Sequence, residues 1–341
     1  MRRIAALILL ALAFALPQQA HAQNAVADFY RGRSVNLIVG YSAGGGYDAW
    51  ARVLARHMGK HIPGNPAIVV QNMPGAGSLK AANYLFNVAP KDGTTFGVFS
   101  RGMVMEPLIG GAGTQYDSTK FNWLGSGTNE DSVFVIWHAS PVKTWADMLA
   151  KTFTVGGEGS GSDPDVYALL LRNAFDVKLR LISGYPGSAE IALALERNEV
   201  DARTSWSWSS LKAQRPDWVR DKKVSLPVQL NLTRGAELQD VPAITEFAKD
   251  ERQRQMLKLV VSRQAMARPF AAPPGIPDDR KLALRKAFDD TMKDSEFLAE
   301  MKARGLEVNP VSGADLDKLV AELYATPPAV VAETRKAISG Q

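Results

Sequence analysis

A serine between two glycines raises the first question of chemistry in this chain. Residues 40–44 read G-Y-S-A-G at a predicted strand-to-helix turn, which is the setting of the nucleophilic serine in many hydrolases. Such a serine needs a histidine base, which comes late in the chain of that fold. Only His57, His61 and His138 follow Ser42, and they come too early or on the next helix. A secreted serine hydrolase is therefore the less favoured interpretation.

The same turn is suited to binding an anion. It follows a predicted strand, 35–39, and leads into a helix whose first N–H groups have no partner within the helix. Glycines let a ligand approach the backbone closely, and the helix dipole adds about half a positive charge. The loop residues predicted to contact an anion are Tyr41, Ser42, Ala43, Gly44, Gly45 and Gly46. A bare tight turn is the alternative, and Asp48 is expected to cap the helix more than to touch a ligand.

A second glycine turn lies in the other half of the chain. It follows a predicted strand, 178–182, precedes a helix, and consists of Ser183, Gly184, Tyr185, Pro186, Gly187 and Ser188. Two such turns in separate halves predict an anion clamped between two lobes. A third turn, 156–164, also joins a strand to a helix, with Asp163 as the expected N-cap and Pro164 at the first helical position. It lacks the lysine of a P-loop, which disfavours nucleotide binding.

Other side chains have open interpretations. Arg101 follows a strand end and could hold a carboxylate through two hydrogen bonds, although a solvated loop arginine is equally compatible. Trp206 and Trp208 are expected to face the same way, either into a cleft or onto a helix. His57 and His61 have the spacing of two metal ligands, but the glycine and proline around them favour a solvated pair at a fraying helix end.

Short β-rich segments alternate with helical periodicity along the chain. Strands are predicted at 35–39, 67–71, 95–99, 133–137, 153–156, 178–182, 200–204 and 224–230. This alternation favours parallel α/β sheets with helices on both faces, and such sheets bind ligands beyond the carboxyl ends of their strands. A proline cluster, 269–277, is predicted to be a connector before a helical region, 278–337.

The first 22 residues have the pattern of a signal peptide. Arg2 and Arg3 precede an apolar run of about thirteen residues, and a small-x-small site ends at Ala22. The run is shorter than the roughly 20 residues of a membrane-spanning helix, so export is expected. The sequence has no cysteine, which excludes disulfides and thiolate chemistry. Cleavage would remove two arginines and lower the formal charge from +5 to +3. Without a dense basic run, nucleic-acid binding is not expected.

The remaining length, about 320 residues, predicts two domains.

Six short motifs follow one another along the chain in an order and spacing that are typical of one protein family. They are 38–48 (I-V-G-Y-S-A-G-G-G-Y-D), 72–77 (N-M-P-G-A-G), 89–94 (A-P-K-D-G-T), 184–187 (G-Y-P-G), 200–201 (V-D) and 240–246 (D-V-P-A-I-T-E). Together they resemble the periplasmic substrate-binding proteins of tripartite tricarboxylate transporters, called the Bug or TctC family. Ser42 departs from this pattern, in which a proline is usual.

The resemblance implies an α/β fold: a two-lobed periplasmic binding protein of type II, a Venus flytrap, each lobe a sheet flanked by helices. Residues 23–127 and 235–341 would form one lobe and residues 128–234 the other, with crossings near 125–128 and 231–235. Such a protein is expected to be a monomer without cofactor or metal, and not an enzyme. It would close on a small carboxylate and deliver it to the membrane subunits of the transporter. A ligand sensor for a signalling receptor is a further alternative.

The resemblance also implies which residues touch the ligand. The two glycine turns, 41–48 and 184–188, would hold one carboxylate largely through backbone amides. Further lining positions implied by the resemblance are Ser100, Arg101, Ser160, Ser162, Trp206 and Ser207.

Overall fold

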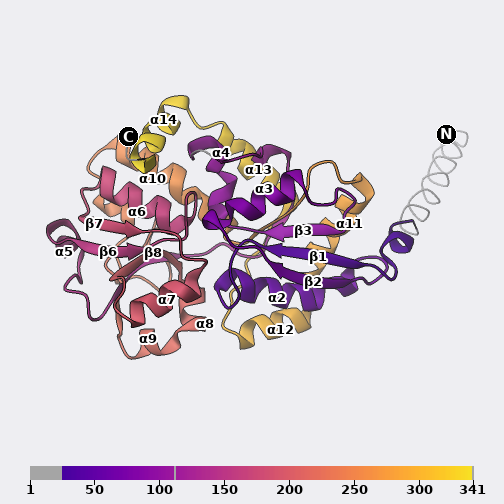
Figure 1. Ribbon diagram of the computed structural model, residues 1–341, viewed down its shortest axis with the longest axis horizontal. Coiled ribbons are helices and arrows are strands. Elements are labelled where there is room, and N and C mark those ends of the chain that lie inside the picture. Colours follow the sequence, from indigo (N-terminus) through magenta and orange to yellow (C-terminus); the bar gives the residue numbers. More distant parts are fainter. Residues whose placement is uncertain (1–24, 111–112, 340–341) are drawn as a thin grey trace, which may run out of the picture.

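The computed structural model describes residues 25–110 and 113–339. The predicted signal peptide, 1–22, lies outside these residues. Within them the chain forms two sheets, each flanked by helices, side by side along the long axis of the molecule (Figure 1). In this part of the chain no helix has both the length and the apolar character needed to cross a membrane.

The first sheet has six strands in the order β11-β4-β10-β3-β1-β2. Their bounds are β1 (Ser34–Val39), β2 (Ala67–Asn72), β3 (Thr95–Val98), β4 (Asn122–Ser126), β10 (Pro269–Ala272) and β11 (Val311–Ser312). β1 runs parallel to β2 and β3, whereas β10 is antiparallel to both β3 and β4. The first sheet is therefore mixed, and not parallel as the alternation of strands and helices predicted.

The second sheet has five strands in the order β7-β6-β8-β5-β9. Their bounds are β5 (Ser132–Trp137), β6 (Phe153–Gly156), β7 (Leu179–Ile182), β8 (Ala202–Ser207) and β9 (Val224–Ser225). β6 is parallel to β7 and β8, and β5 is antiparallel to β8 and β9. The predicted strand 224–230 is thus shorter, with an isolated bridge at Gln229.

Helices cover both faces of each sheet because successive strand residues point to opposite sides. Figure 1 shows α2 and α12 beneath the first sheet, with α3 and α13 above it. In β5, Val133 and Val135 pack in one apolar cluster with Ile191 of α7, while Phe134 and Ile136 pack in another with helix α6. The helices of the first sheet are α2 (Gly46–Met58), α3 (Leu79–Asn87), α11 (Asp278–Thr291), α12 (Ser295–Ala303) and α13 (Gly313–Tyr324). Those of the second are α5 (Trp145–Ala150), α6 (Asp163–Ala174), α7 (Ser188–Glu196), α8 (Trp208–Gln214) and α9 (Pro216–Arg220).

Three further helices lie where the lobes meet: α4 (Glu106–Ile109), α10 (Glu251–Ser262) and α14 (Pro328–Ser339). The C-terminal helix α14 packs on α6 of the second lobe and on α10. It also touches the first lobe, where Arg335 Nη2 donates to the carbonyl of Leu108 in α4 at 2.7 Å. α10 is held to the end of α6 by Gln253 Nε2, which donates to the carbonyl of Ala174 at 2.5 Å.

The two sheets are joined by residues 127–131 in one direction. In the other direction the chain enters the first sheet again only at Pro269. Shortly before Pro269 the chain still touches the second lobe, because Gln264 Nε2 donates to the hydroxyl of Tyr167 in α6 at 3.2 Å. We therefore propose that the chain returns to the first lobe between Ser262 and Pro269, later than the segment 231–235 expected from the sequence.

The segment predicted to be a connector at 269–277 contains a central strand instead. Pro269 is the first residue of β10, a position in which its missing N–H removes no interior ladder bond. All four residues of β10 are buried. The prediction was wrong because this strand is only four residues long and begins with proline, so its sequence alone carries no strand signal.

Candidate ligand-binding site

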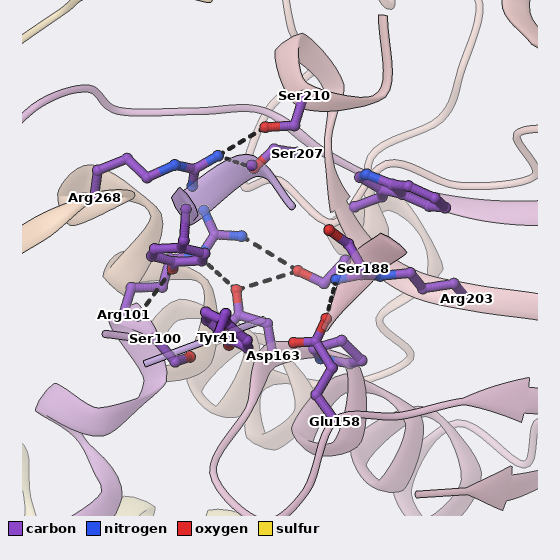
Figure 2. Close-up of a pocket in the computed structure, with 15 residues that line it drawn as sticks. Tyr41, Ser100, Arg101, Glu158, Asp163, Ser188, Arg203, Ser207, Ser210 and Arg268 are labelled. Carbon is purple, nitrogen blue, oxygen red and sulfur yellow. Dashed lines mark hydrogen bonds and ion pairs between the residues drawn. The ribbon is translucent and has the colours of Figure 1, made fainter. Parts of the chain in front are cut away.

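A small cavity lies between the lobes, beyond the carboxyl ends of β1, β3, β6 and β8 (Figure 2). About 40 Å³ of it is open to the centre of a water molecule, which is space for roughly three waters. The residues that line it are Tyr41, Gly46, Tyr47, Ser100, Arg101, Glu158, Asp163, Pro164, Ser188, Arg203, Ser205, Trp206, Ser207, Ser210 and Arg268. Both lobes therefore contribute polar and charged side chains to one cavity.

The turn after β1 is held in shape by the first helical turn of α2. Gly44 has a φ of +86°, which favours glycine, and its N–H donates to Asp48 Oδ2 at 2.9 Å. Asp48 also accepts hydrogen bonds from Arg52 and Asn72. Burial raises the pKa of Asp48, but the hydrogen bonds from Arg52, Gly44 and Asn72 outweigh it and hold the pKa below its usual value. Asp48 does not line the cavity, and its contacts are those of a structural cap.

The starts of α2 and α7 face each other, as expected from the two glycine turns. A Cβ on Gly45 would lie 2.9 Å from Ser188 Oγ, and one on Gly187 would lie 2.7 Å from Ser42 Oγ. Ser42 Oγ donates to Glu190 Oε2 at 2.8 Å. The absence of a side chain at both positions lets the two turns approach this closely, and a Cβ at either one would require the facing serine side chain to move. The turns therefore touch each other directly and contribute few residues to the cavity.

Seven of the predicted ligand contacts line the cavity, and they come from four different segments: Tyr41, Gly46, Ser100, Arg101, Ser188, Trp206 and Ser207. The structure places the others around it, in the two turns, in the α2 cap and before α6: Ser42, Ala43, Gly44, Gly45, Asp48, Ser160, Ser162, Gly184, Tyr185, Pro186 and Gly187. Of these, Ser160 Oγ is bonded to Glu106 Oε1 at 3.2 Å and Ser162 Oγ to Asp165 Oδ1 at 3.0 Å.

Arg101 is buried, and it reaches across the cavity to the other lobe. Its Nε forms a short ion pair with Asp163 Oδ2, and its Nη2 donates to Ser132 Oγ at 2.7 Å. Asp163 is the first residue of α6 and Ser162 is the N-cap, contrary to the predicted order. Burial raises the pKa of Asp163, but the guanidinium groups of Arg101 and Arg263 outweigh it, so the pKa lies below its usual value. The predicted arginine–carboxylate contact is thus made within the protein.

Arg203 forms the second ion pair of the cavity, and sequence reasoning missed it. Its Nη2 lies 2.8 Å from Glu158 Oε1, and its guanidinium lies 4.8 Å from the centre of the Trp206 ring. Burial raises the pKa of Glu158, and Arg203 offsets this only in part. The sequence did offer one signal for Arg203, because a charged residue inside a predicted strand, 200–204, indicates a buried charge that needs a partner.

A distortion of β8 turns several of its residues toward the cavity. The register between β5 and β8 shifts between Val133 and Val135, and Ser205 has a φ of +48°. Bulges of this kind re-aim side chains and are common beside functional sites. Trp206 consequently lines the cavity and also packs edge-on against Trp218, so both of its proposed roles are found. Trp208 instead begins α8, and its Nε1 donates to a surface carboxylate; the two tryptophans do not share one role.

Arg268 is the third guanidinium of the cavity, and it lies in the segment that leads into β10. Its Nη2 is 3.0 Å from Glu130 Oε1 and donates to Ser210 Oγ at 2.8 Å and to Ser207 Oγ at 3.1 Å. Its guanidinium lies 4.5 Å from the centre of the Tyr47 ring. Arg268 and Glu130 come from the two crossing segments, so neither position follows from local sequence.

The arrangement does not support a hydrolase. Ser42 Oγ is bonded to Glu190, and among the described residues no histidine is hydrogen-bonded to it. His57 and His61 are bonded to carboxylates of the first lobe, and His138 is exposed.

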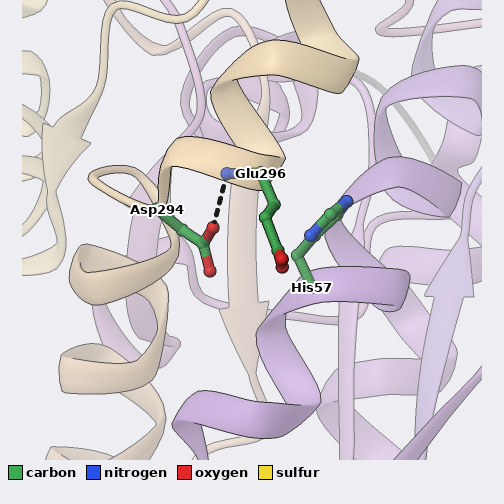
Figure 3. A group of neighbouring side chains, drawn as sticks. All are labelled: His57, Asp294 and Glu296. Carbon is green, nitrogen blue, oxygen red and sulfur yellow. Dashed lines mark hydrogen bonds between the residues drawn. The ribbon is translucent and has the colours of Figure 1, made fainter.

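The histidine pair is part of an ion-pair network between the end of α2 and the start of α12. Figure 3 shows His57 facing Asp294 and Glu296. His57, Asp294 and Glu296 each offer a ligand atom within 4.8 Å of the others. However, Lys60 Nζ lies 2.6 Å from both carboxylates, and His57 Nε2 lies 2.9 Å from Glu300 Oε2. The Lys60 ammonium already compensates the negative charge of these acids. We therefore interpret the cluster as a set of ion pairs that holds the two helices together, and not as a metal site. The histidines are partly buried in this cluster, which corrects the predicted solvated pair.

Solved structures with this two-lobed fold have low sequence identity to the chain. BugD has a TM-score of 0.73 at 22% identity, covering 90% of this chain and 98% of BugD. MatC from Rhodopseudomonas palustris, with bound malate, has a TM-score of 0.68 at 21% identity over 88% of this chain and 99% of MatC. A second R. palustris protein, with adipate, has a TM-score of 0.69 at 19% identity over 89% of this chain and 97% of its own. These likenesses establish the fold.

Comparison of sequences shows the family in addition to the fold. The chain spans 39% of a UPF0065 protein from Cupriavidus necator, at 32% identity over 137 residues. It spans 65% of a UPF0065 protein from Agrobacterium vitis, at 27% identity over 238 residues. The model of the family described as tripartite tricarboxylate transporter family receptor matches residues 50–335. By this match, the chain belongs to that family, TctC.

Proposed function

We propose that this protein captures a small carboxylate between its lobes and delivers it to the membrane subunits of a tripartite tricarboxylate-type transporter. The observation that carries the proposal is a cavity between the lobes lined by three buried guanidinium groups, those of Arg101, Arg203 and Arg268. Guanidinium groups recognise carboxylates through charge and directed hydrogen bonds. The malate and adipate in two proteins of the same fold support this class of ligand.

The proposed ligand contacts come from both lobes. Tyr41, Gly46, Ser100 and Arg101 would contact the ligand from the first lobe, and Ser188, Arg203, Trp206 and Ser207 from the second. The remaining residues of the two glycine turns would act by letting the lobes meet, since Gly45 and Gly187 make that contact possible. Asp48 would hold the first turn in shape.

In this proposal the protein binds and releases its ligand unchanged, without a cofactor. A ligand that touches both lobes favours the form in which they meet, and membrane subunits can recognise that form. The chain would act in the periplasm as a monomer, after cleavage of the segment 1–22. Its mass after purification from the periplasm would then correspond to a chain that begins at Gln23.

The binding step is tested by thermal unfolding of the exported protein with mono-, di- and tricarboxylates. A cognate ligand at 100 times its Kd should stabilise the protein by about 2.7 kcal/mol. Arg203→Gln should lose the effect, whereas Arg220→Gln, whose partner is the exposed Asp221, should keep it. If no carboxylate raises the unfolding temperature of the wild-type protein, the proposed ligand class is wrong.

The transport step needs a separate measurement. Uptake of the ligand by cells without this chain should fall, and expression of the wild-type protein should restore it. Binding without any effect on uptake would favour the sensor instead.

A further inference from the structure

The charges of the cavity match a ligand with one negative charge. Three buried guanidinium groups and two buried carboxylates line it: Arg101, Arg203, Arg268, Glu158 and Asp163. Three positive groups against two negative ones leave a net charge of +1 among the lining side chains. A single carboxylate neutralises this set, whereas a second carboxylate would leave an uncompensated negative charge in a buried space.

Most lining donors that are still available for a ligand lie on the second lobe. Nε and Nη1 of Arg203, and Nε1 of Trp206, have no hydrogen-bond partner among the residues that the structure describes, and two further lining donors, Nη1 of Arg101 and Nε of Arg268, also lack one. Arg203 and Trp206 are buried, with 6% and 2% of their surface exposed, and both line the cavity. Figure 2 shows Arg203 entering from the second lobe beside Glu158. Buried donors without a partner are costly unless a ligand or water accepts from them.

Two of the side chains that line the cavity are acidic, which disfavours a second carboxylate in the ligand. They are Asp163 and Glu158. Behind Glu158, the buried Asp165 accepts hydrogen bonds from the N–H groups of Glu158 and Gly159. These carboxylates repel a second negative charge. The small cavity volume also favours a short ligand.

We propose that this cavity selects a short monocarboxylate, held by Arg203 and Trp206, over the corresponding dicarboxylate. The inference rests on the proposed function, because it concerns the ligand of the same cavity. It also makes side chains, and not the amides of the two glycine turns, the main partners of the carboxylate.

The experiment is isothermal titration calorimetry of the exported protein with matched pairs of acids, propionate against succinate and lactate against malate. Within each pair the second acid adds one carboxylate to the same short chain. We expect the monocarboxylate of at least one pair to bind tenfold or more tightly than its dicarboxylate. Equal or tighter binding of both dicarboxylates would overturn the charge argument and leave the proposed function intact. If none of the four acids binds, while a longer carboxylate does, the argument from charge and size is also wrong.

Two variants separate the hydrogen-bond donor of Trp206 from the negative charge of Glu158. Trp206→Phe keeps the ring beside Trp218 but removes the Nε1 donor, and should weaken monocarboxylate binding about tenfold. Glu158→Gln removes one negative charge next to Arg203, and should lower the preference for monocarboxylates at least tenfold. Arg220→Gln is the control and should change neither value. An unchanged preference in a folded Glu158→Gln protein, with folding checked by circular dichroism, would contradict the proposal.

Discussion

The ion pair between Arg101 and Asp163 predicts an unequal effect of removing either partner. Arg101 follows β3 of the first lobe and Asp163 begins α6 of the second, so the pair exists only while the lobes meet. Asp163→Asn leaves two buried guanidinium groups without a carboxylate, those of Arg101 and Arg263. Arg101→Gln leaves Asp163 with Arg263, whose Nε lies 3.3 Å from Oδ1. Asp163→Asn should therefore be the more damaging change.

The magnitude follows from the burial of the pair. Breaking a buried ion pair by removing one partner costs about 3–5 kcal/mol. If the lobes separate, water reaches the unpaired groups, so the cost falls on the closed form and not on the folding of each lobe. Ligand binding, which needs the closed form, should weaken by about a hundredfold or more in Asp163→Asn. In Arg101→Gln the shift of the unliganded protein toward separated lobes should be smaller, because Asp163 keeps Arg263 as a partner, although this variant also loses a proposed ligand contact.

Calorimetry with the carboxylate that binds the wild-type protein measures both losses, and small-angle X-ray scattering measures the separation of the lobes. The radius of gyration without ligand should be larger for Asp163→Asn than for the wild-type protein. Thermal unfolding gives the control for folding. An equal increase of the radius of gyration in the two unliganded variants, or a larger one in Arg101→Gln, would refute the reasoning.

Three other predictions concern the supports of the site. Gly187→Ala causes no backbone strain but brings a Cβ to 2.7 Å from Ser42 Oγ. The resulting overpacking costs about 1–3 kcal/mol in the form in which the turns meet, so ligand binding measured by calorimetry should weaken about tenfold. The unfolding temperature of the unliganded protein should not fall. Asp48→Ala removes the carboxylate that accepts hydrogen bonds from Gly44, Arg52 and Asn72 and should cost about 1–2 kcal/mol in urea unfolding. A loss near zero would contradict the role of Asp48 in holding the first turn in shape. Hydrogen bonding from Arg56 lowers the pKa of Glu300 from 4.5 to about 2. Because this pKa is depressed in the folded protein, its stabilisation is present above pH 4.5 and is lost as the pH falls toward 2. Glu300→Gln should flatten that part of the stability profile.

Much of the fold was predictable from local patterns. The strands at 67–72 and 153–156 have continuous β-rich runs, and the glycine turns after β1 and β7 fix where helices begin. β10 was not predictable because its four residues owe their strand conformation to the neighbours β3 and β4 on either side. Its antiparallel direction depends on the return of the chain from the other lobe, which no local pattern encodes.

The candidate site also has features that could be predicted from local sequence and features that could not. The meeting of the two glycine turns followed from sequence, because each turn is defined by adjacent residues. The buried charges did not, because Arg203 is compatible with burial only through Glu158, which lies 45 residues earlier in the chain. Arg268 likewise depends on Glu130 from another crossing segment. A lone arginine in a sequence is normally solvated, so only the pairing in space identifies such residues.

The packing of the C-terminal helix has a consequence for the path by which a solute enters. α14 is bonded to α4 of the first lobe and to α6 of the second, where Asn173 Nδ2 donates to the carbonyl of Ala337 at 2.6 Å. A brace on that flank resists spreading there, so the lobes must swing apart on the opposite flank, where α2 meets α7. The bond from Ser42 to Glu190 lies at that meeting point. We therefore expect a solute to enter between the two glycine turns and to reach the arginines that line the cavity behind them.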